Sequence, residues 1–375
     1  MHLSEQESLA ALGKRENKMH VMIVTSCMAG GGAERVISHL LRSFVKQGTK
    51  CSLVLVNKTK RDYEIPEQVI VREIGKLSSN PLSDKLKRYA KVRSIARELS
   101  PDVVLSLPEE IGIYVILAMI GSGIPVVVSE RNNPRVMPYK KITRALRRLA
   151  YPFAKGLVFQ TEMARDYFPK HLHKKSIVLP NPLDISELPD AYKGERERTV
   201  VGAGRLNVQK NFPLLIDAFA IFHESHPDYK LIIYGEGECA EPLEEKARAA
   251  LPEGSYAFPG RVKDLVQRMN KAAMFVLSSD YEGMPNVLIE AMATGVPSIS
   301  TDCPSGGSAM LIKDGENGFL TPVGDANALA EAMNRIADDK ELSETFSENG
   351  IKVRQLLEAD KICGEWLRYL EGKKR

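Results

Sequence analysis

Short runs of apolar residues alternate with longer stretches of helical periodicity along most of the chain. The apolar runs of the first half cover residues 19–26, 51–57, 102–107, 125–133, 156–161 and 176–182. Runs of this length, rich in valine, isoleucine and leucine, are typical of parallel strands that are buried on both faces. Helical patterns lie between them, so this order predicts repeated strand–helix–strand units and a parallel sheet.

The second half repeats this pattern after a polar stretch. Residues 183–198 lack a strong period, and we expect a linker between two domains there. Apolar runs follow at 199–206, 230–238, 256–265 and 273–279, and residues 325–370 have a helical pattern. A length of 375 residues also suits two domains better than one. The sequence therefore predicts a two-domain α/β protein.

Residues 278–297 combine an apolar helix with two carboxylates. Pro285 suits the first turn of that helix, and Gly295 suits its end. The helix is apolar on most of its surface, so Glu290 should be buried, where a carboxylate is costly unless it is paired or hydrogen-bonded. Hydroxyls of a nucleotide sugar would satisfy Glu290 and Glu282, and the helix N-terminus between them suits phosphate. From the two carboxylates alone, a core helix with one solvated glutamate is the simpler interpretation.

The complete string SSDYEGMPNVLIEAMATGVPSIS favours the nucleotide-sugar interpretation over the core helix. It resembles the E-x7-E signature of the retaining GT-B glycosyltransferases of the family 4 type, which include sucrose-phosphate synthases and many bacterial cell-surface glycosyltransferases. The spacing from Glu282 to Glu290 matches, as do the flanking Gly-Met-Pro and Ala-x-Ala-x-Gly-x-Pro. The string GRLNVQKN at 204–211 is similar to the family pattern Gly-Arg-Leu-x-x-x-Lys-(Gly/Asn). The resemblance covers residues 19–370.

The resemblance implies a GT-B fold, in which two Rossmann-like domains face a cleft and the C-terminal helix returns to the first domain. We expect a flexible extension at 1–18, an acceptor-binding domain at 19–190, a nucleotide-sugar-binding domain at 191–358 and the returning helix at 359–375. The implied reaction moves an N-acetylhexosamine or hexose, with retention, from a UDP-sugar to a hydroxyl. The implied acceptor is a glycan or a polyprenyl-diphosphate-linked glycan of bacterial surface polysaccharide synthesis.

The resemblance also assigns roles to individual residues. Arg205 and Lys210 would stabilise charge on the leaving diphosphate, and with Glu282, which would hold the sugar hydroxyls, they are the expected catalytic residues. Glu290 would hold the ribose, and Val262 would contact the uracil. The expected donor-binding residues are Gly31, Gly32, Arg205, Lys210, Val262, Glu282, Gly283, Met284, Asn286, Val287 and Glu290.

The glycine-rich turn after the first apolar run, GGGAER at 30–35, admits more than one interpretation. A dinucleotide fingerprint requires Gly-x-Gly-x-x-Gly and an acidic residue at the end of the second strand. The third glycine position is absent and Asn57 ends that strand, so NAD binding is disfavoured. The turn resembles the family loop that borders the donor sugar and the acceptor, and a plain tight turn stays open as well.

The string Ser-Glu-Arg-Asn-Asn-Pro at 129–134 departs from the family pattern. Many relatives have a histidine near this strand end that acts close to the donor sugar, whereas Glu130 stands here. Polar residues at the carboxyl end of a parallel strand lie where ligands bind. Glu130, Arg131 and Asn132 are therefore candidates for contacts with the acceptor or the donor sugar, or for structural pairing. Ser305-Gly306-Gly307 is a second candidate turn near the phosphates.

The net charge of +4 is unevenly distributed. Residues 1–190 contain 30 Lys and Arg against 19 Asp and Glu, a net charge of +11, and the remainder contains 22 against 29, a net charge of −7. Two patterns, 83–99 and 139–153, place basic residues beside apolar ones, as in helices that lie on membranes. Their basic residues are Lys85, Lys87, Arg88, Lys91, Arg93, Arg97, Lys140, Lys141, Arg144, Arg147 and Arg148. We expect peripheral attachment to an anionic membrane, on the cytoplasmic face of the plasma membrane, and not nucleic-acid binding, because no recognition module accompanies the charge.

Metal and cofactor chemistry are not expected. The five cysteines form no Cys-x-x-Cys pair and no histidine cluster accompanies them, which fits free thiols in a reducing cytoplasm. No Asp-x-Asp follows a strand end, and Arg205 and Lys210 would already supply the positive charge that a metal ion provides. No apolar run has the length of a membrane span, and the first residues lack a secretory pattern.

Two other function classes remain open. An enzyme resembling UDP-GlcNAc 2-epimerases would share the architecture and interconvert two nucleotide sugars without an acceptor, although such enzymes normally lack the E-x7-E stretch. A non-catalytic nucleotide-sugar-binding module would bind the nucleotide and turn nothing over. The ionisable residues present in the expected donor site argue against a loss of catalysis.

Overall fold

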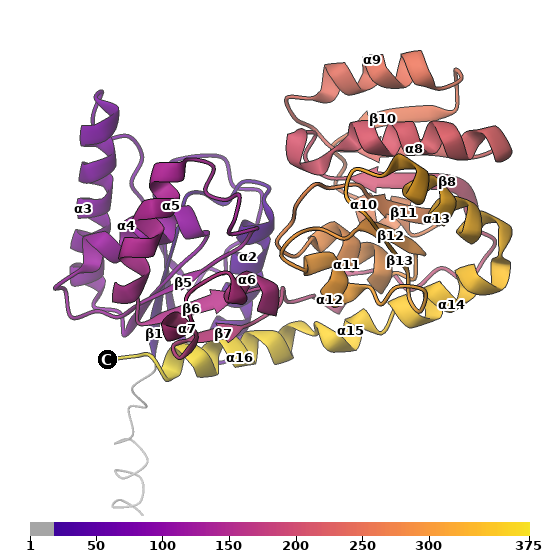
Figure 1. The fold of residues 1–375 in the computed structure, drawn as a ribbon. Coiled ribbons are helices and arrows are strands. Elements are labelled where there is room, and N and C mark those ends of the chain that lie inside the picture. Colours follow the sequence, from indigo (N-terminus) through magenta and orange to yellow (C-terminus); the bar gives the residue numbers. More distant parts are fainter. Residues whose placement is uncertain (1–18) are drawn as a thin grey trace, which may run out of the picture. The chain divides into compact units, whose positions relative to one another are not determined.

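The computed structural model describes residues 19–375, and these residues form two compact units. The first unit consists of residues 19–129, 141–158 and 363–375, and the second of residues 130–140 and 159–362. A sheet flanked by helices forms the centre of each unit (Figure 1). The predicted extension at 1–18 lies outside the described residues, and the predicted domain limits at residues 190 and 358 stay predictions.

The first sheet has seven strands in the order β3-β2-β1-β4-β5-β6-β7. The strands are β1 (His20–Thr25), β2 (Lys50–Leu55), β3 (Ile70–Glu73), β4 (Val103–Ser106), β5 (Val126–Ser129), β6 (Gly156–Phe159) and β7 (Ser176–Val178). The pairs β1–β2, β1–β4, β2–β3, β4–β5 and β5–β6 are parallel. The apolar runs predict every strand of this sheet except β3, whose sequence IVRE is partly exposed and has no apolar run.

Helices connect these strands. They are α2 (Gly32–Lys46), α3 (Pro81–Leu99), α4 (Glu109–Met119), α5 (Lys141–Ala150), η1 (Tyr151–Phe153), α6 (Glu162–Asp166), α7 (Lys170–His173) and η2 (Ile185–Glu187). The start of α3 follows from its sequence, because the Asn80 side chain accepts hydrogen bonds from the N–H groups of Leu82 and Ser83 and Pro81 occupies the first position.

The second sheet has six strands in the order β10-β9-β8-β11-β12-β13. The strands are β8 (Glu197–Ala203), β9 (Lys230–Tyr234), β10 (Tyr256–Gly260), β11 (Ala272–Leu277), β12 (Ser298–Thr301) and β13 (Phe319–Thr321), and all their pairings are parallel. The helices are η3 (Val208–Lys210), α8 (Phe212–Ser225), α9 (Ala240–Ala250), α10 (Leu265–Met269), α11 (Asn286–Ala293), α12 (Gly307–Leu311), α13 (Ala326–Asp338), α14 (Lys340–Gly350), α15 (Val353–Leu356) and α16 (Ala359–Glu371).

Both sheets are doubly wound, and the predicted α/β fold of two Rossmann-like parts is confirmed. The strand order reverses between β1 and β4 in the first sheet and between β8 and β11 in the second. In open parallel sheets, ligands bind beyond the carboxyl ends of the strands at such a reversal. One apolar cluster of the second unit centres on α8 and α13 and another on α11, and they bury opposite faces of the sheet.

The last helix returns to the first unit, as expected. Residues 363–375 belong to that unit, and the Tyr369 hydroxyl is within hydrogen-bonding distance of the main-chain N and O of Leu157, at 3.0 and 3.2 Å. A side chain at Gly156 would collide with the Tyr369 ring. The sequence around β6 therefore accommodates the end of α16.

The basic residues of α3 and α5 differ in exposure, and Arg147 is buried although its basic pattern predicts a surface position. Arg88 forms an ion pair of 2.8 Å with Asp84, and Arg93 donates hydrogen bonds to carbonyl groups at the end of α4. Arg147 is only 1% exposed. The exposed cations of these two helices are Lys87, Lys91, Arg97, Lys141 and Arg148. Among residues 19–375, no helix has the length and apolar composition required to span a membrane.

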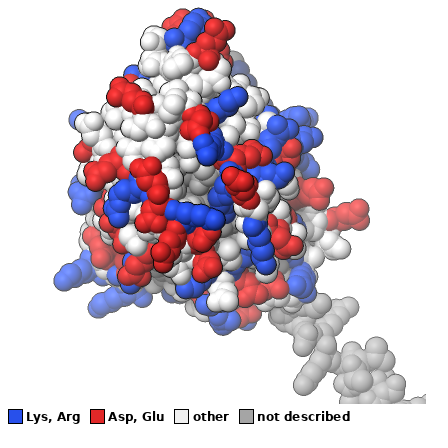
Figure 2. Space-filling model, turned by 90° about the vertical axis from the view of Figure 1, so that its right-hand side faces the viewer, with Lys and Arg blue, Asp and Glu red and all other residues white. Residues whose placement is uncertain are grey.

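Positive and negative side chains are mixed on the face of the molecule that Figure 2 shows. Lysine and arginine side chains lie beside aspartate and glutamate over most of that surface. This face therefore carries no extended patch of a single charge.

Candidate active site

Three of the expected donor residues of the second unit follow the two strands between which the order of the second sheet reverses. Arg205 and Lys210 follow the carboxyl end of β8, and Glu282 follows the carboxyl end of β11. These two strands are parallel neighbours, so the segments that follow them lie at the same edge of the sheet. The structure thus brings together Lys210 and Glu282, which lie 72 positions apart in the sequence.

Glu282 is a buried carboxylate with three polar partners. It is 7% exposed. Its Oε1 lies 2.7 Å from the Lys210 ammonium and accepts a hydrogen bond of 2.7 Å from the Ser279 hydroxyl. Its Oε2 accepts a longer bond of 3.3 Å from the Gln209 side chain. The ammonium and the two neutral donors compensate the cost of burying this charge and hold the carboxylate in one orientation.

Lys210 reaches Glu282 because the backbone at Gly204 leaves room for it. Gly204 has φ +154°, and a Cβ there would lie 2.8 Å from Lys210 Cε. The Asn207 side chain accepts a hydrogen bond of 3.3 Å from the main-chain N of Lys210 and caps the turn η3. Glycine at position 204 and asparagine at 207 therefore place the ammonium beside the carboxylate.

Arg205 differs from Lys210 in that its side chain is exposed. Within the described part of the chain it forms no ion pair, so its guanidinium has no carboxylate to exchange for an anionic ligand. A planar guanidinium and a compact ammonium at one sheet edge can bind several oxygens of a diphosphate. Lys210 is therefore already neutralised by Glu282, whereas the charge of Arg205 is not offset by a carboxylate of the described residues.

Helix α11 carries the second carboxylate of the stretch. It begins at Asn286, directly after Pro285, and Gly295 with φ +76° follows its end, close to the predicted limits. Leu288 is fully buried, and Glu290 is 4% exposed, which confirms the predicted burial. Val262 and Val287 are partly buried and pack against the same apolar cluster as α11.

Asn181 connects several expected site residues. It is 2% exposed, and its Nδ2 donates to the Met284 carbonyl at 3.1 Å and to Asn286 Oδ1 at 2.6 Å. Its Oδ1 accepts hydrogen bonds from the Arg131 guanidinium and, at 2.8 Å, from the Gln160 side chain. One buried amide thus links the segment after β5 to the segment that precedes α11, and sequence patterns gave no signal for it.

Close backbone contacts hold the loop of Glu282. A Cβ at Gly283 would collide with the Gln160 side chain and with the main-chain O of Arg131, and a Cβ at Gly307 would collide with the main-chain O of Gly283. The Ser305 hydroxyl donates to the main-chain O of Glu282, from a backbone with φ +95°. The predicted second turn at 305–307 therefore lies against the Glu282 loop.

A pair of tyrosines links segment 130–140 to this loop. The hydroxyls of Tyr139 and Tyr281 are 2.6 Å apart. Burial, followed by the Tyr139 hydroxyl, raises the pKa of Tyr281 above its ordinary value. Tyr281 therefore keeps its proton under neutral conditions and provides a hydrogen-bonding hydroxyl next to Glu282.

Glu130 and Asn132 flank Arg131, whose main-chain O lies against Gly283. Glu130 is 2% exposed, and Asn132 accepts a hydrogen bond of 2.7 Å from the main-chain N of Asn133. Gly31 and Gly32 belong to the first unit, where Gly31 precedes α2 and its carbonyl accepts a hydrogen bond of 3.2 Å from the Tyr63 hydroxyl. These two glycines and Glu282 therefore belong to different units.

Two family models match the chain. Residues 30–187 match a model described as Glycosyltransferase Family 4, and residues 186–353 match one described as Glycosyl transferases group 1. Together they cover residues 30–353, which include every strand of both sheets except β1. The chain is a glycosyltransferase of the family 4 type.

Relatives and solved structures agree with this assignment. The glycosyltransferase is 28% identical over 358 residues to the Campylobacter jejuni enzyme GalNAc-alpha-(1->4)-GalNAc-alpha-(1->3)-diNAcBac-PP-undecaprenol alpha-1,4-N-acetyl-D-galactosaminyltransferase, and the match covers 94% of this chain and 98% of the relative. It is also 28% identical over 363 residues to the N-acetylgalactosamine-N,N'-diacetylbacillosaminyl-diphospho-undecaprenol 4-alpha-N-acetylgalactosaminyltransferase of the same organism, with coverage of 92% and 97%. Its fold matches Anabaena HepE, solved with UDP and glucose, with a TM-score of 0.80 at 19% identity over 94% of this chain and 99% of that one. The predicted GT-B fold is confirmed.

The ionisable residues of this glycosyltransferase form no evident metal centre in the part of the chain that the structure describes. No group of three or more His, Cys, Asp or Glu residues there has the geometry to hold an ion. The charges at the sheet reversal include those of Arg205, Lys210 and Glu282.

Proposed function

We propose that this glycosyltransferase moves an N-acetylhexosamine or hexose, with retention, from a UDP-sugar to a hydroxyl of a glycan or polyprenyl-diphosphate-linked acceptor. The observation that carries the proposal is the ion pair of Lys210 and Glu282 at the sheet reversal, close in sequence to the exposed Arg205. The family assignment supports the reaction class. The undecaprenol-linked substrates in the names of the two relatives support the acceptor class, and the UDP and glucose bound to HepE support the donor class.

In this proposal the cations act on the leaving diphosphate. As the bond between the anomeric carbon and the diphosphate breaks, negative charge grows on the phosphate oxygens. Arg205 and Lys210 would bind those oxygens, and Arg205 would add charge that no carboxylate of the described residues offsets. Because these two side chains would supply the positive charge, we propose that the reaction needs no metal ion.

The carboxylates would bind the two sugars of the donor. Glu282, held by Ser279 and Lys210, would accept hydrogen bonds from hydroxyls of the transferred sugar. Buried Glu290 would accept them from the ribose, and Val262 would contact the base. Retention then proceeds on one face of the sugar, because no residue of the sequence stands out as a nucleophile for a double displacement.

A polyprenyl-linked acceptor lies in a membrane, so the enzyme would act at a membrane surface. Exposed cations on α3 and α5 lie beside the exposed apolar side chains Leu86, Ile142 and Leu149. We propose that these helices attach the enzyme to the anionic cytoplasmic face of the plasma membrane, where each nearby cation contributes about 1 kcal/mol. Doubling the salt concentration should release the enzyme from anionic vesicles, and salt-insensitive binding would contradict the attachment.

Ligand-induced stabilisation tests the donor site. The enzyme is heated with EDTA and with UDP, GDP, NAD or one of a panel of UDP-sugars. A ligand at about 100 times its dissociation constant adds about 2.7 kcal/mol of stability. Stabilisation by UDP and one UDP-sugar is expected and would name the donor. Stabilisation by GDP alone would change the donor class, and stabilisation by NAD but not UDP would refute the donor site. Interconversion of UDP-sugars without acceptor would instead indicate the epimerase reaction.

A further inference from the structure

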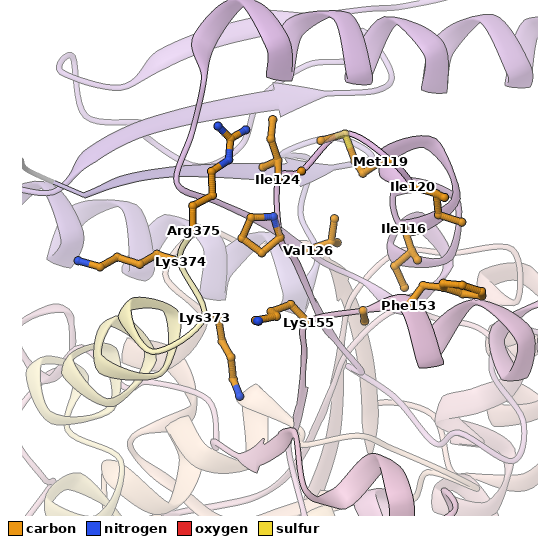
Figure 3. Close-up of a pocket in the computed structure, with 14 residues that line it drawn as sticks. Ile116, Met119, Ile120, Ile124, Val126, Phe153, Lys155, Lys373, Lys374 and Arg375 are labelled. Atoms are coloured by element: carbon orange, nitrogen blue, oxygen red, sulfur yellow. The ribbon is translucent and has the colours of Figure 1, made fainter.

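The first unit contains a cavity of about 470 Å³ at the amino ends of β5 and β6. The end of α4, the residues that precede β5 and β6, η1 and residues 373–375 surround it. Figure 3 shows this arrangement. Ligand sites of doubly wound sheets lie beyond the carboxyl ends of the strands, at the opposite edge. The cavity therefore lies at the edge of the first sheet opposite to the edge where ligands of such folds bind.

The cavity has two chemically different walls. Side chains of α4 and η1, among them Ile116, Ile120 and Phe153, form an apolar side, and in Figure 3 they lie together. Four cations, Lys155, Lys373, Lys374 and Arg375, line the rest of the cavity, and in Figure 3 the side chains of Lys373, Lys374 and Arg375 point in different directions. Within residues 19–375, none of these four forms an ion pair with a carboxylate, although Lys373 lies 4.9 Å from the centre of the Tyr369 ring.

Neighbouring contacts keep both walls in place. Arg93 donates hydrogen bonds of 2.8 and 2.6 Å to the carbonyls of Ala118 and Ile120, which fixes the end of α4. The hydrogen bonds of Tyr369 with Leu157 hold the end of α16 against β6, so residues 373–375 stay at the cavity. The cavity is thus part of the folded unit.

An apolar side together with cations in one cavity favours an anionic amphiphile as the ligand. Cations that line one side of a cavity without an ion pair among the described residues can all turn toward one anion. A phosphate that binds among them gains charge-assisted hydrogen bonds. The apolar wall favours a hydrocarbon chain over a polar base or sugar, because those groups would lose hydrogen bonds to water there. Phe153 and Ile120 are 65% and 47% exposed at the rim, and a bound chain would cover them.

We propose that this cavity binds one anionic phospholipid, with the phosphate among Lys155, Lys373 and Lys374 and the start of an acyl chain along Ile116, Ile120 and Phe153. The site goes beyond the proposed attachment through α3 and α5, since it selects one lipid molecule with a defined stoichiometry. It does not depend on the sugar-transfer reaction.

Calorimetric titration of the full chain with a water-soluble lipid tests the proposal without a membrane. Dihexanoyl phosphatidylglycerol below its micelle concentration should bind at one molecule per chain. Dihexanoyl phosphatidylcholine should bind at least fivefold more weakly, and inorganic phosphate at least tenfold more weakly because it has no acyl chain. Equal binding of both lipids, or phosphate binding as tight as phosphatidylglycerol, would overturn the proposal.

Two sets of variants locate the binding. Each cation near the phosphate contributes roughly a fivefold factor, so K155Q/K373Q/K374Q should weaken binding by about 100-fold. The matched variant K87Q/K91Q/R97Q removes the same charge from α3 and should leave binding of the soluble lipid unchanged. Phe153→Ser and Ile120→Asn change exposed side chains and should each weaken it severalfold. Equal losses in both triple variants would overturn the proposal.

Two further readouts test whether the donor site or a second copy of the chain is involved in this binding. Stabilisation by UDP should be the same in K155Q/K373Q/K374Q as in the wild type, so a failure of the donor assignment does not affect this test. Sedimentation velocity should show a monomer whose mass the triple variant does not change. A dimer that the triple variant dissociates would assign the cavity to a second copy of the chain and overturn the proposal.

Discussion

Replacing Glu282 with glutamine should tighten the binding of UDP while it strongly reduces sugar transfer. In the ligand-free enzyme, Glu282 holds the Lys210 ammonium at 2.7 Å. A diphosphate that binds Lys210 must therefore compete with this carboxylate and then remain next to it. The amide of glutamine keeps the shape and the hydrogen bond from Ser279, but it removes the charge.

The size of the effect follows from the geometry. A phosphate oxygen about 2.8 Å from Lys210 Nζ lies within about 5.5 Å of the Glu282 oxygen, because the two distances add. Two unit charges at about 5.5 Å repel each other by about 3 kcal/mol at an effective dielectric constant of about 20, and by less than about 1 kcal/mol in water. The side chains of Lys210 and Glu282 are 15% and 9% exposed, so the value lies between these limits. Loss of about 1–3 kcal/mol of repulsion should tighten UDP binding about 5- to 150-fold.

Calorimetry with UDP and an acceptor-dependent assay of UDP release measure the two effects. Transfer should fall at least about 100-fold, as for the loss of one group that binds the transition state. The matched control is Glu316→Gln, because Glu316 forms an equally short pair with Lys313 but is 58% exposed. That variant should bind UDP as the wild type does. Unchanged or weaker UDP binding by Glu282→Gln would refute the placement of the diphosphate beside this pair.

Three other predictions concern the scaffold of the site. Gly283→Ala should lower the free energy of unfolding by about 2 kcal/mol, because its Cβ would meet the backbone of segment 130–140. In Gly364→Ala, in α16, the new Cβ meets nothing closer than 3.7 Å, and the free energy of unfolding should rise by up to about 1 kcal/mol. Urea titrations of both variants measure this contrast, and equal effects would contradict it. Asn181→Ala should lower the same free energy by at least about 2 kcal/mol, because it leaves buried partners unbonded, and a loss below about 0.5 kcal/mol would show that the amide holds nothing. Burial raises the pKa of the Cys51 and Cys303 thiols from 9.0 to about 12, so the folded chain keeps protons that the unfolded chain loses in this range. The stability that these thiols contribute should therefore be complete below a pH of about 9 and decrease as the pH rises toward about 12, and a double alanine variant that shows the same pH slope would exclude them as the cause.

The strands could be predicted because their apolar runs are local. Runs of valine, isoleucine and leucine between helical patterns predicted the strands of both sheets except β3, β12 and β13. The short strand β3 was not predicted, because an exposed edge strand needs no apolar run. Strands β12 and β13 lie within a segment that was recognised by its resemblance alone. The burial of Glu290 was also predictable, since its helix has apolar side chains on most of its surface.

The contacts of the site were not predictable in the same way, because they depend on which strand ends meet. Nothing local to Lys210 indicates that its ammonium pairs with Glu282, 72 residues later. Asn181 lies a few residues after β7, and nothing near it in the sequence indicates that its amide forms hydrogen bonds with Arg131 before it and with Asn286 after it. Likewise, Arg147 occurs in a basic pattern typical of a surface helix, but packing places it in the interior.

The stereochemistry of the transferred sugar tests the proposed reaction most directly. The enzyme is incubated in EDTA with the α-linked UDP-sugar that stabilises it and with a soluble analogue of a polyprenyl-diphosphate-linked glycan, and proton NMR records the anomeric signal of the new linkage. We expect acceptor-dependent release of UDP and an α-linked product, which the Glu282→Gln variant does not form. A β-linked product, or equal product formation by that variant, would contradict the retaining reaction at this site.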